Sequence, residues 1–551
     1  MSKKRSFVHQ AAILAVASLI VRLVGFSYRL PLTSLVGDMG NTFYSTAYHV
    51  YAFAIIISSG ALPAAISKLV SERIAVGKYS DAHELFKNAL GIAVAIGAIA
   101  ALFMAIGADW LTQLRFFNYP EAANAIRALA PTVFIVALLA VFRGYFQGMN
   151  TMIPTAVSQV IEQIFNAVFS IWLAHVFYRA VRAEQAAASV VGAVADAVAA
   201  AAGATGAAIG TGIGAAGGFF VVLGLYLLIA KDLRQRAARS LHTPAPDGTN
   251  EKRKAQIRTI LLTALPIIIG MGIYHIATFI DLGMAKDRIM SSGIFTDDQV
   301  DIMVGQFTGK FLLLTILPVS LSVALSQAII PDISSSKAVM DRNAVKHKIN
   351  TAMRISMTLS IPAAVALSVL ADPILALLFP SHPEGGWLLR FGSVSIIFLA
   401  LVQVSSGALQ GIGKVMLPVV AAFFGVMIKI PINWYLLAVP EINILGTVIS
   451  TIACYIVAAI INLYFLHKYT GVLPDYISAF LKPTFAATGM GFACFATYHI
   501  AGLLIPGRVA TIVAMAVGLP VYLALMWAIG GFHRQDMDAA PLPRIVRKWL
   551  G

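Results

Sequence analysis

The chain has 551 residues, of which 59% are hydrophobic and only 12% are charged, with a formal net charge of +15. An ordinary soluble protein is about 45–50% apolar and about 25% charged, so this chain carries too little charge to coat a soluble protein of its size. The composition excludes a soluble globular enzyme, an intrinsically disordered chain and a disulfide-stapled secreted domain, and it leaves an integral membrane protein.

Long apolar runs follow one another along the whole chain. A bilayer core about 30 Å thick requires about 20 apolar residues in each crossing helix, and runs of that length predict an all-α integral membrane protein with 14 transmembrane helices. The runs are too long for the strands of a membrane barrel and do not alternate as such strands do. They lie near residues 10–37, 43–67, 88–107, 127–149, 154–178, 205–230, 258–283, 306–330, 352–371, 387–410, 416–437, 444–467, 483–504 and 509–530.

The basic residues between the runs predict the orientation of the chain. If successive runs cross the membrane in alternation, 28 of the 40 lysines and arginines lie on the side of the N-terminus and eight on the other side. Cytoplasmic loops carry the excess of basic residues in membrane proteins. We therefore expect a multi-pass protein of the bacterial cytoplasmic (inner) membrane with both termini in the cytoplasm. The positive charge reflects topology, so no nucleic-acid partner is expected.

A polar, basic and Pro-containing linker separates the first six runs from the next six, and two additional runs follow. The outer stretch 180–203 is rich in alanine and shows no recognisable chemistry. The predicted organisation is an N-terminal lobe at 1–230, a cytoplasmic basic linker at 231–257, a C-terminal lobe at 258–467, and two additional helices with a basic cytoplasmic tail at 468–551.

The two halves share landmarks in the same order. The Gln-Gly pair at 147–148 ends the fourth run and recurs at 410–411, where it ends the tenth run, and Asn166 and Asn433 follow at similar distances. Chance is an alternative, because glycine is common in membrane helices, but the landmarks fall at equivalent runs. Six runs are an even number, so the halves would be parallel repeats. Two pseudo-symmetric six-helix lobes that rock about a central cavity are the architecture of a transporter.

Cationic residues within the runs are the first candidates for function. Ionisable groups are costly in hydrocarbon and usually face a protein interior or a wet cavity. Arg22 and Arg29 are seven residues apart, about two helical turns, and so share one face of a helix. Two arginines on one face suit an anion such as a pyrophosphate, although pairing with acids between helices would also explain them. Lys68 and Lys310 lie near predicted ends of runs, where they either contact a ligand or reach to the interface.

Other polar residues within the runs form either a coupling-ion site or a polar cavity, and interhelical hydrogen bonds explain them equally well. Asp281 is a proton or sodium site, or the structural partner of Lys310. No cluster with metal-ligand spacing is visible, and whether a metal ion binds is left open. These candidates are Glu162, Asn166, Asp281, Lys429 and Asn433.

Three segments carry a resemblance to a known family. They read RLVGFSYRLPLTSLVG at 22–37, FYSTAYHVYAFAIIISSGALPAAISKLVSER at 43–73 and LPVSLSVALSQAIIPDISSS at 317–336. The chain resembles the stage V sporulation protein B and YtgP branch of polysaccharide-type flippases, within the multidrug/oligosaccharidyl-lipid/polysaccharide (MOP) exporter superfamily. This branch is related to the MurJ lipid II flippases, and the resemblance covers nearly the whole chain.

The resemblance implies a flippase, not an enzyme, that moves an undecaprenyl-pyrophosphate-linked cell-wall precursor, lipid II first, by alternating access. First-lobe arginines of the family grip the pyrophosphate, and Arg22 and Arg29 match them, the second with a displacement of one residue. The basic pair that MurJ proteins carry before the glycine of the second span is replaced here by Ile57-Ser58-Ser59. Lys68 would compensate from further along the helix, and Lys310 loosely replaces a MurJ arginine.

Several alternatives stay open at this point. The cargo is lipid II, another polysaccharide lipid or a teichoic-type lipid-linked oligosaccharide; a multidrug/cation antiporter, a membrane glycosyltransferase and a scaffold for wall synthesis are the other classes. No cofactor is expected. Transport would be coupled to sodium, to protons or to the membrane potential. The expected partners are the lipid-linked oligosaccharide, membrane lipids and the cell-wall synthesis machinery.

Overall fold

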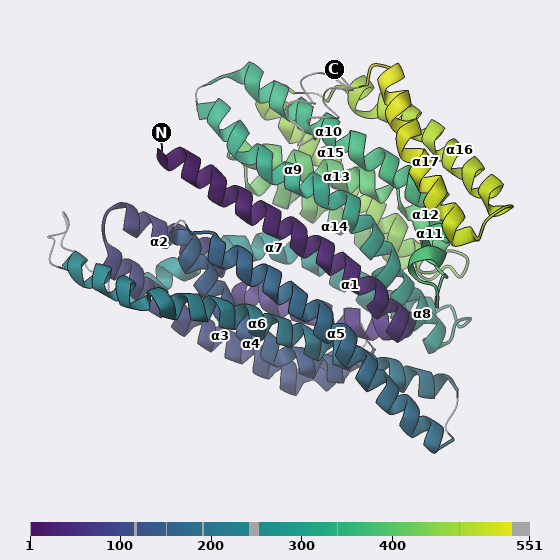
Figure 1. The fold of residues 1–551 in the computed structure, drawn as a ribbon, viewed down its shortest axis with the longest axis horizontal. Helices are drawn as coiled ribbons and strands as arrows, with labels where there is room; N and C mark the ends of the chain where they lie inside the picture. Colours follow the sequence, from purple (N-terminus) through teal and green to yellow (C-terminus); the bar gives the residue numbers. More distant parts are fainter. Residues whose placement is uncertain are drawn as a thin grey trace. The chain divides into compact units, whose positions relative to one another are not determined.

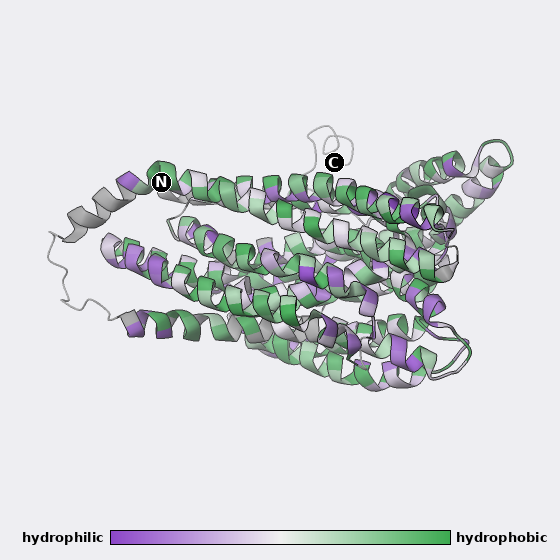
Figure 2. Cartoon of the chain, turned by 90° about the horizontal axis from the view of Figure 1, so that it is seen from below, coloured by the Kyte–Doolittle hydropathy of each residue, from purple (hydrophilic) through white to green (hydrophobic). Residues whose placement is uncertain are grey.

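The structure, a computed structural model, describes residues 2–114, 118–149, 151–189, 192–241, 253–338, 340–472 and 474–531. Within these ranges the chain forms helices and no strand, which confirms the all-α class (Figure 1). Hydrophobic residues cover most of the length of the helices (Figure 2). Part of the predicted linker, residues 190–191 of the outer segment and the basic tail after residue 531 lie outside the described residues.

Contacts divide the chain into two compact units. The first unit consists of Met1–Asp287 and Asp297–Gly305, and the second of Arg288–Thr296 and Gln306–Gly551. The first unit contains α1 (Ser2–Ile55), η1 (Ile56–Gly60), α2 (Leu62–Ala75), α3 (Tyr79–Gln113), η2 (Pro120–Ala122), α4 (Ala123–Gly148), α5 (Ile153–Ala187), α6 (Ala193–Leu241), nearly all of α7 (Arg253–Met290) and of α8 (Asp297–Gln306).

The second unit begins its main part at a π-helical turn, η3, and ends with a helical hairpin. Its elements are η3 (Phe307–Phe311), α9 (Leu312–Ala338), α10 (Arg342–Val369), α11 (Ala371–Leu378), α12 (Gly386–Gly392), α13 (Ser395–Gly411), α14 (Met416–Leu436), α15 (Leu445–Thr470), η4 (Ile477–Leu481), α16 (Lys482–Gly502) and α17 (Gly507–Ala528).

Among the described residues, ten helices are long and apolar enough to cross a membrane, or eleven if the bent pair α12–α13 is one span. One of the ten, at 20–74, covers most of the predicted run 10–37 and all of the run 43–67. Gly37 interrupts α1 there with φ 71° and ψ 179°, a conformation that glycine alone adopts readily. The predicted runs 258–283 and 483–504 correspond to α7 and α16, which are not among the ten. The count of 14 stays a prediction.

Helix α7 groups with the first unit. Asn88 of α3 donates to the side chain of Gln256 at 2.7 Å, and the rings of Phe53 and Phe279 lie 5.4 Å apart. The predicted lobes rest on the sequence repeat rather than on contacts, and they assign α7 to the C-terminal lobe at 258–467. Those lobe boundaries therefore stay a prediction.

Two ion pairs recur at a constant spacing. Arg127 pairs with Asp109 in the first unit, and Arg390 pairs with Asp372 in the second. Each residue of the second pair lies 263 positions after its counterpart, the spacing that also separates the two Gln-Gly landmarks. Two unrelated glycine-rich sequences would not be expected to form ion pairs at matching positions. The recurrence therefore supports the internal repeat.

Ring pairs and close helix contacts recur at the same spacing. Tyr44 stacks on Tyr48 with ring centroids 6.0 Å apart, and Phe307, 263 positions after Tyr44, stacks on Phe311 at 5.5 Å. The contact of Gly148 with Val70 also recurs. A Cβ at Gly148 would lie 2.7 Å from the Cβ of Val70, and one at Gly411 would lie 2.9 Å from the Cβ of Ile333. The two units thus contain corresponding packing positions.

Small residues bring α5 and α6 into close contact along their length. A Cβ on Gly210 would lie 2.3 Å from the backbone nitrogen of Ser170, closer than real atoms approach. Helices in membranes associate through such small-residue interfaces, because lipid provides no hydrophobic driving force. The glycines of α6 thus keep α5 and α6 closely packed.

Candidate functional site

Arg29 of α1 lies over two aromatic rings of the same long helix. Its guanidinium carbon is 5.6 Å from the ring centroid of Tyr44 and 5.4 Å from that of Tyr48. The contact is possible because Gly37 interrupts the helix between Arg29 and the tyrosines. Cation–π contacts of this kind contribute about 0.5–2 kcal/mol, more where water is excluded. Tyr44 is buried and Arg29 is half-buried, so the rings hold the guanidinium in place.

A chain of hydrogen bonds lies beside Arg29 and joins three helices. Asn166 of α5 donates to the hydroxyl of Tyr28 at 3.3 Å and accepts from Thr211 of α6 at 3.2 Å. The hydroxyl of Thr211 lies 3.2 Å from that of Tyr44. Asn166 was predicted as a polar cavity residue, and here it connects the tyrosines around Arg29 to α5 and α6. Such a network fixes side chains within the membrane.

A cavity of about 270 Å³ opens where α1, α4 and α5 meet. Its wall contains two guanidinium groups, two carboxamides and one carboxylate. It is lined by Val21, Arg22, Arg143, Gln159, Glu162 and Gln163. The structure thus brings together two residues predicted from sequence, Arg22 and Glu162, and adds Arg143 to them.

Arg143 of α4 is a site residue that the sequence analysis missed. The 28 basic residues on the side of the N-terminus include Arg143, although it lies inside the predicted run 127–149. Its Nη2 donates to Oε2 of Glu162 at 2.7 Å, and its Nε donates to the hydroxyl of Ser158 at 3.0 Å. The side chains are only 14% and 28% exposed. The position of an arginine within an apolar run was the signal available in the sequence.

The cavity and the Arg29 cluster lie along the packed pair of helices α1 and α5. Arg22 and Arg29 are two turns apart on α1, and Glu162 and Asn166 are one turn apart on α5. The four charged residues Arg22, Arg29, Arg143 and Glu162 together carry a formal charge of +2. A strip of that charge can bind an anion bidentately through the planar guanidinium groups.

The two predicted lysines lie elsewhere. Lys68 is exposed on α2 and is not among the residues that line the cavity. Lys310 is only 1% exposed in the π-helical turn η3. Its ammonium group donates to the backbone oxygen of Glu384 at 2.9 Å and lies 5.8 Å from the ring centroid of Phe379. Their roles in binding stay predictions.

The remaining predicted polar residues are buried in their helices. Asp281 of α7 is 4% exposed, and Lys429 and Asn433 of α14 are 5% and 0% exposed. Asn433 accepts a hydrogen bond from Ser450 of α15 at 2.6 Å. Asn433 therefore joins two helices of the second unit, as Asn166 joins helices of the first. Whether any of them binds an ion stays a prediction.

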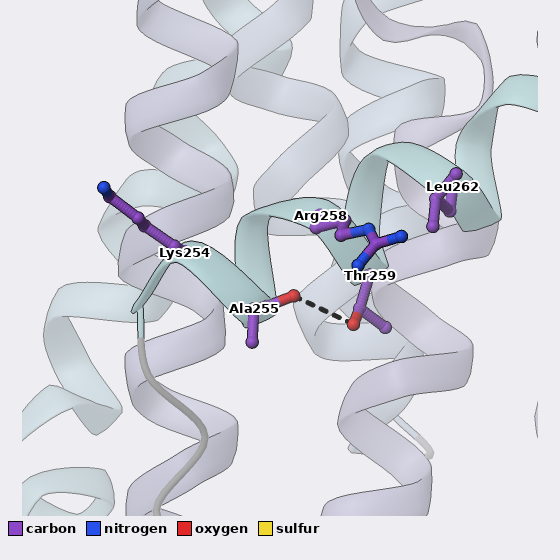
Figure 3. A pocket seen from close by; sticks show the side chains of 5 residues that line it. All are labelled: Lys254, Ala255, Arg258, Thr259 and Leu262. Atoms are coloured by element: carbon purple, nitrogen blue, oxygen red, sulfur yellow. Dashed lines mark hydrogen bonds between the residues drawn. The ribbon is translucent and has the colours of Figure 1, made fainter.

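A second pocket, of about 420 Å³, lies at the start of α7. Figure 3 shows its lining side chains, all from this one helix, with Thr259 donating to the backbone oxygen of Ala255 at 2.9 Å. Lys254 and Arg258 provide its positive charge and Leu262 an apolar side. A shallow face formed by one helix cannot enclose a ligand, so the cavity at α1, α4 and α5 is the stronger candidate.

Metal-ligating and thiol groups add little to this site. Within the described ranges, no group of three or more His, Cys, Asp or Glu side chains is placed to hold a metal ion. Cys454 and Cys494 are both buried thiols, and neither lines the cavity.

Family comparison decides what kind of protein carries this site. The profile of the family described as "Polysaccharide biosynthesis protein" matches residues 7–337 of the chain, and the MatE profile matches residues 298–435. The chain belongs to the polysaccharide biosynthesis protein family. This confirms the predicted resemblance to polysaccharide-type flippases of the MOP superfamily.

Individual relatives agree with the family. "Lipid II flippase MurJ" of Bacillus subtilis (strain 168) is 26% identical, and the match covers 97% of each chain. "Stage V sporulation protein B" of the same organism is 23% identical, with 83% of each chain covered. Together with the family match, these relatives show that this chain is a multi-pass membrane protein of the flippase and transporter class.

Solved structures share the fold. An inward closed conformation of "Lipid II flippase MurJ" aligns with a TM-score of 0.63 and 16% identity, covering 94% of this chain and 98% of that one. An inward-facing multidrug resistance MATE family transporter of the MOP superfamily aligns with a TM-score of 0.64 and 16% identity, covering 83% and 98%. At this identity the likeness describes the fold alone.

Proposed function

We propose that this protein is a flippase for a lipid-linked cell-wall precursor of the lipid II type. The head group enters a cavity from the inner leaflet, its pyrophosphate binds the arginines along α1 and α5, and its prenyl tail stays in lipid. The two six-helix lobes then rock to open toward the outer leaflet of the bacterial inner membrane. In this proposal the chain crosses the membrane 14 times and both termini are cytoplasmic.

The observation that carries the proposal is the pair of guanidinium groups in the cavity of the first unit, with a third further along α1. Arg22 and Arg143 line one cavity, whose lining contains the carboxylate of Glu162, and Arg29 lies further along the same helix pair. Charged groups within a membrane are costly and mark sites of function. A pyrophosphate is the part of a lipid-linked precursor that needs several cations at once, because each charge-assisted hydrogen bond contributes about 1.5–3 kcal/mol.

One alternative has an observation in its favour. The MatE profile matches residues 298–435, and a MATE transporter shares the fold, which suits export of cationic drugs by a cation antiporter. A site for cationic drugs requires an excess of acids, and the cavity of the first unit has an excess of bases. The charge therefore favours an anionic cargo.

Flipping of a fluorescent lipid II analogue in proteoliposomes tests the proposal. Each of the variants Arg22→Gln and Arg29→Gln removes one cationic contact, so we expect about ten- to hundredfold weaker apparent affinity for the lipid. Arg127→Gln is the matched control, because that arginine is exposed, pairs with Asp109 and lies outside the cavity. Unchanged flipping in both Arg22→Gln and Arg29→Gln would remove the proposed role of the arginines.

The driving force is part of the proposal and is tested in the same vesicles. Sodium, a proton gradient or the membrane potential could each drive net movement, and imposing them one at a time separates them. Partners in wall synthesis are a further expectation, since the product on the outer leaflet must be consumed there.

A further inference from the structure

The ion pair between Arg143 and Glu162 lies in the wall of the cavity in the first unit. Nη2 of Arg143 and Oε2 of Glu162 are 2.7 Å apart, and both side chains are largely buried. Ser158 accepts from Nε of the same guanidinium at 3.0 Å. A guanidinium has five N–H donors, so these two contacts leave donors that can reach a ligand in the cavity.

This ion pair is not part of the framework that the two units share. The framework pair Asp109–Arg127 recurs as Asp372–Arg390, 263 positions later. The position 263 residues after Arg143 is occupied by a serine, Ser406. A pair required for packing would be expected at both places, and its presence in one unit alone points to a task of the cavity.

Aligned on Asn166 and Asn433, which lie 267 rather than 263 positions apart, the residue that corresponds to Glu162 also differs in charge. Glu162 precedes Asn166 by one helical turn, and in the second unit Lys429 precedes Asn433 by the same distance. Both asparagines accept hydrogen bonds from hydroxyl groups of the next helix, Thr211 and Ser450. The acid is therefore confined to the unit whose cavity contains Arg22 and Arg143.

The surroundings of Glu162 suit a side chain that exchanges partners. Gly218 of α6 faces it, and a Cβ at that glycine would lie 3.3 Å from Oε2 of Glu162. The side-chain oxygen of Gln159 in the same wall is buried and has no hydrogen-bond partner. An orphaned acceptor is costly, and a hydroxyl or amide of a bound head group would satisfy it.

We propose that Glu162 is a built-in competitor of the cargo's phosphate for Arg143. Without cargo, the carboxylate neutralises a guanidinium that would otherwise stand uncompensated in a poorly solvated wall. A phosphate that enters the cavity takes over Arg143, and Glu162 moves aside. Displacing the ion pair costs free energy, so the cargo binds more weakly and is released faster than it would be without Glu162. This inference rests on the proposed function and deepens it, because it requires a phosphate-bearing cargo and disfavours neutral lipids.

The test is direct binding of undecaprenyl pyrophosphate to the full-length protein in phosphatidylcholine nanodiscs. Glu162→Gln keeps the size and an acceptor oxygen for Arg143 but removes the competing charge. We expect about tenfold tighter binding, equivalent to about 1.4 kcal/mol, with slower dissociation and a lower maximal flipping rate. Arg143→Gln is expected to weaken binding, and Glu162→Gln is expected to have no further effect when added to Arg143→Gln.

Glu184→Gln is the matched control, because Glu184 lies on the same helix, is exposed and is outside the cavity. If Glu162→Gln does not fold, Glu162→Asp replaces it: its carboxylate is one methylene too short for the 2.7 Å contact, and binding several-fold tighter than in the wild type is expected. Equal or weaker binding by the folded variant would overturn the inference and leave the pair a structural one.

Failure of the proposed function gives a different result. In that case the wild type would not bind undecaprenyl pyrophosphate better than uncharged undecaprenol, and Arg22→Gln would change nothing. If the wild type binds and Arg22→Gln weakens it while Glu162→Gln has no effect, only the competitor role is wrong.

Discussion

The ion pair of Lys286 and Asp301 offers the sharpest test of packing in the first unit. The ammonium nitrogen of Lys286 lies 3.0 Å from the carboxylate of Asp301, and both side chains are only 6% exposed. It also lies 4.7 Å from the ring centroid of Tyr119, which is fully buried. A second carboxylate, of Asp297, lies at 3.6 Å but is 62% exposed, so its contribution is small.

Replacing Lys286 by methionine leaves the carboxylate of Asp301 buried without its cation. Removal of one partner of a buried pair destabilises by about 3–5 kcal/mol, whereas replacement of both by neutral residues is far less harmful. We therefore expect Lys286→Met to lower the thermal unfolding temperature of the detergent-solubilised protein markedly. Adding Asp301→Asn to Lys286→Met is expected to restore most of the loss, with a coupling energy of about 1–3 kcal/mol.

Lys87→Met is the control, because Lys87 is exposed on α3 of the same unit. Surface changes of this kind stay within about 0.5 kcal/mol. The reasoning is refuted if Lys286→Met unfolds at the same temperature as the control, or if the double variant is no more stable than Lys286→Met alone.

Three further predictions concern other parts of the chain. Arg29→Lys keeps the charge but loses the planar contact with Tyr44 and Tyr48, so half-maximal flipping should need several-fold more lipid; identical titrations would argue against the contact. Gly210→Leu should abolish folding, since even its Cβ would lie 2.3 Å from the backbone of α5, whereas Gly224→Ala on the same helix faces open space and should fold, as size-exclusion profiles would report. Hydrogen bonds from Ser478 hold the pKa of Asp475 below its ordinary value of 3.8. Because the folded pKa is the lower one, the stabilisation is present above pH 3.8 and is lost as the pH falls through the lowered pKa. Asp475→Asn should therefore flatten the change of melting temperature between pH 5 and pH 3, and a slope like that of the wild type would contradict this.

Much of the helical framework could be predicted from the sequence. The run 416–437 became α14, Met416–Leu436, and the run 444–467 became α15, Leu445–Thr470. Such runs are legible because the membrane requires continuous apolar helices and polar residues end them. The kink at Gly37 fell at the end of the first predicted run for a physical reason: glycine accepts a φ of 71° that other residues resist.

The site was less accessible to sequence reasoning, because its residues meet across helices. Arg143 and Glu162 are 19 positions apart, and only the packing of α4 against α5 joins them. The partner of Lys310 was equally hidden, since its position at the start of a run does not reveal that its ammonium group donates to the backbone oxygen of Glu384. Charge within a run indicates that a residue needs a partner, and the fold decides which partner it finds.

Photocrosslinking from the cavity tests the central claim most directly. A photoreactive amino acid at Gln163, which lines the cavity, is compared with one at Val94, which is exposed on α3, using radiolabelled lipid II in membranes. We predict strong crosslinking from position 163, which Arg22→Gln weakens and excess undecaprenyl pyrophosphate removes. From position 94 we predict weak crosslinking that excess undecaprenyl pyrophosphate does not reduce. Equal crosslinking from both positions, or labelling at 163 that the pyrophosphate does not reduce, would contradict the account.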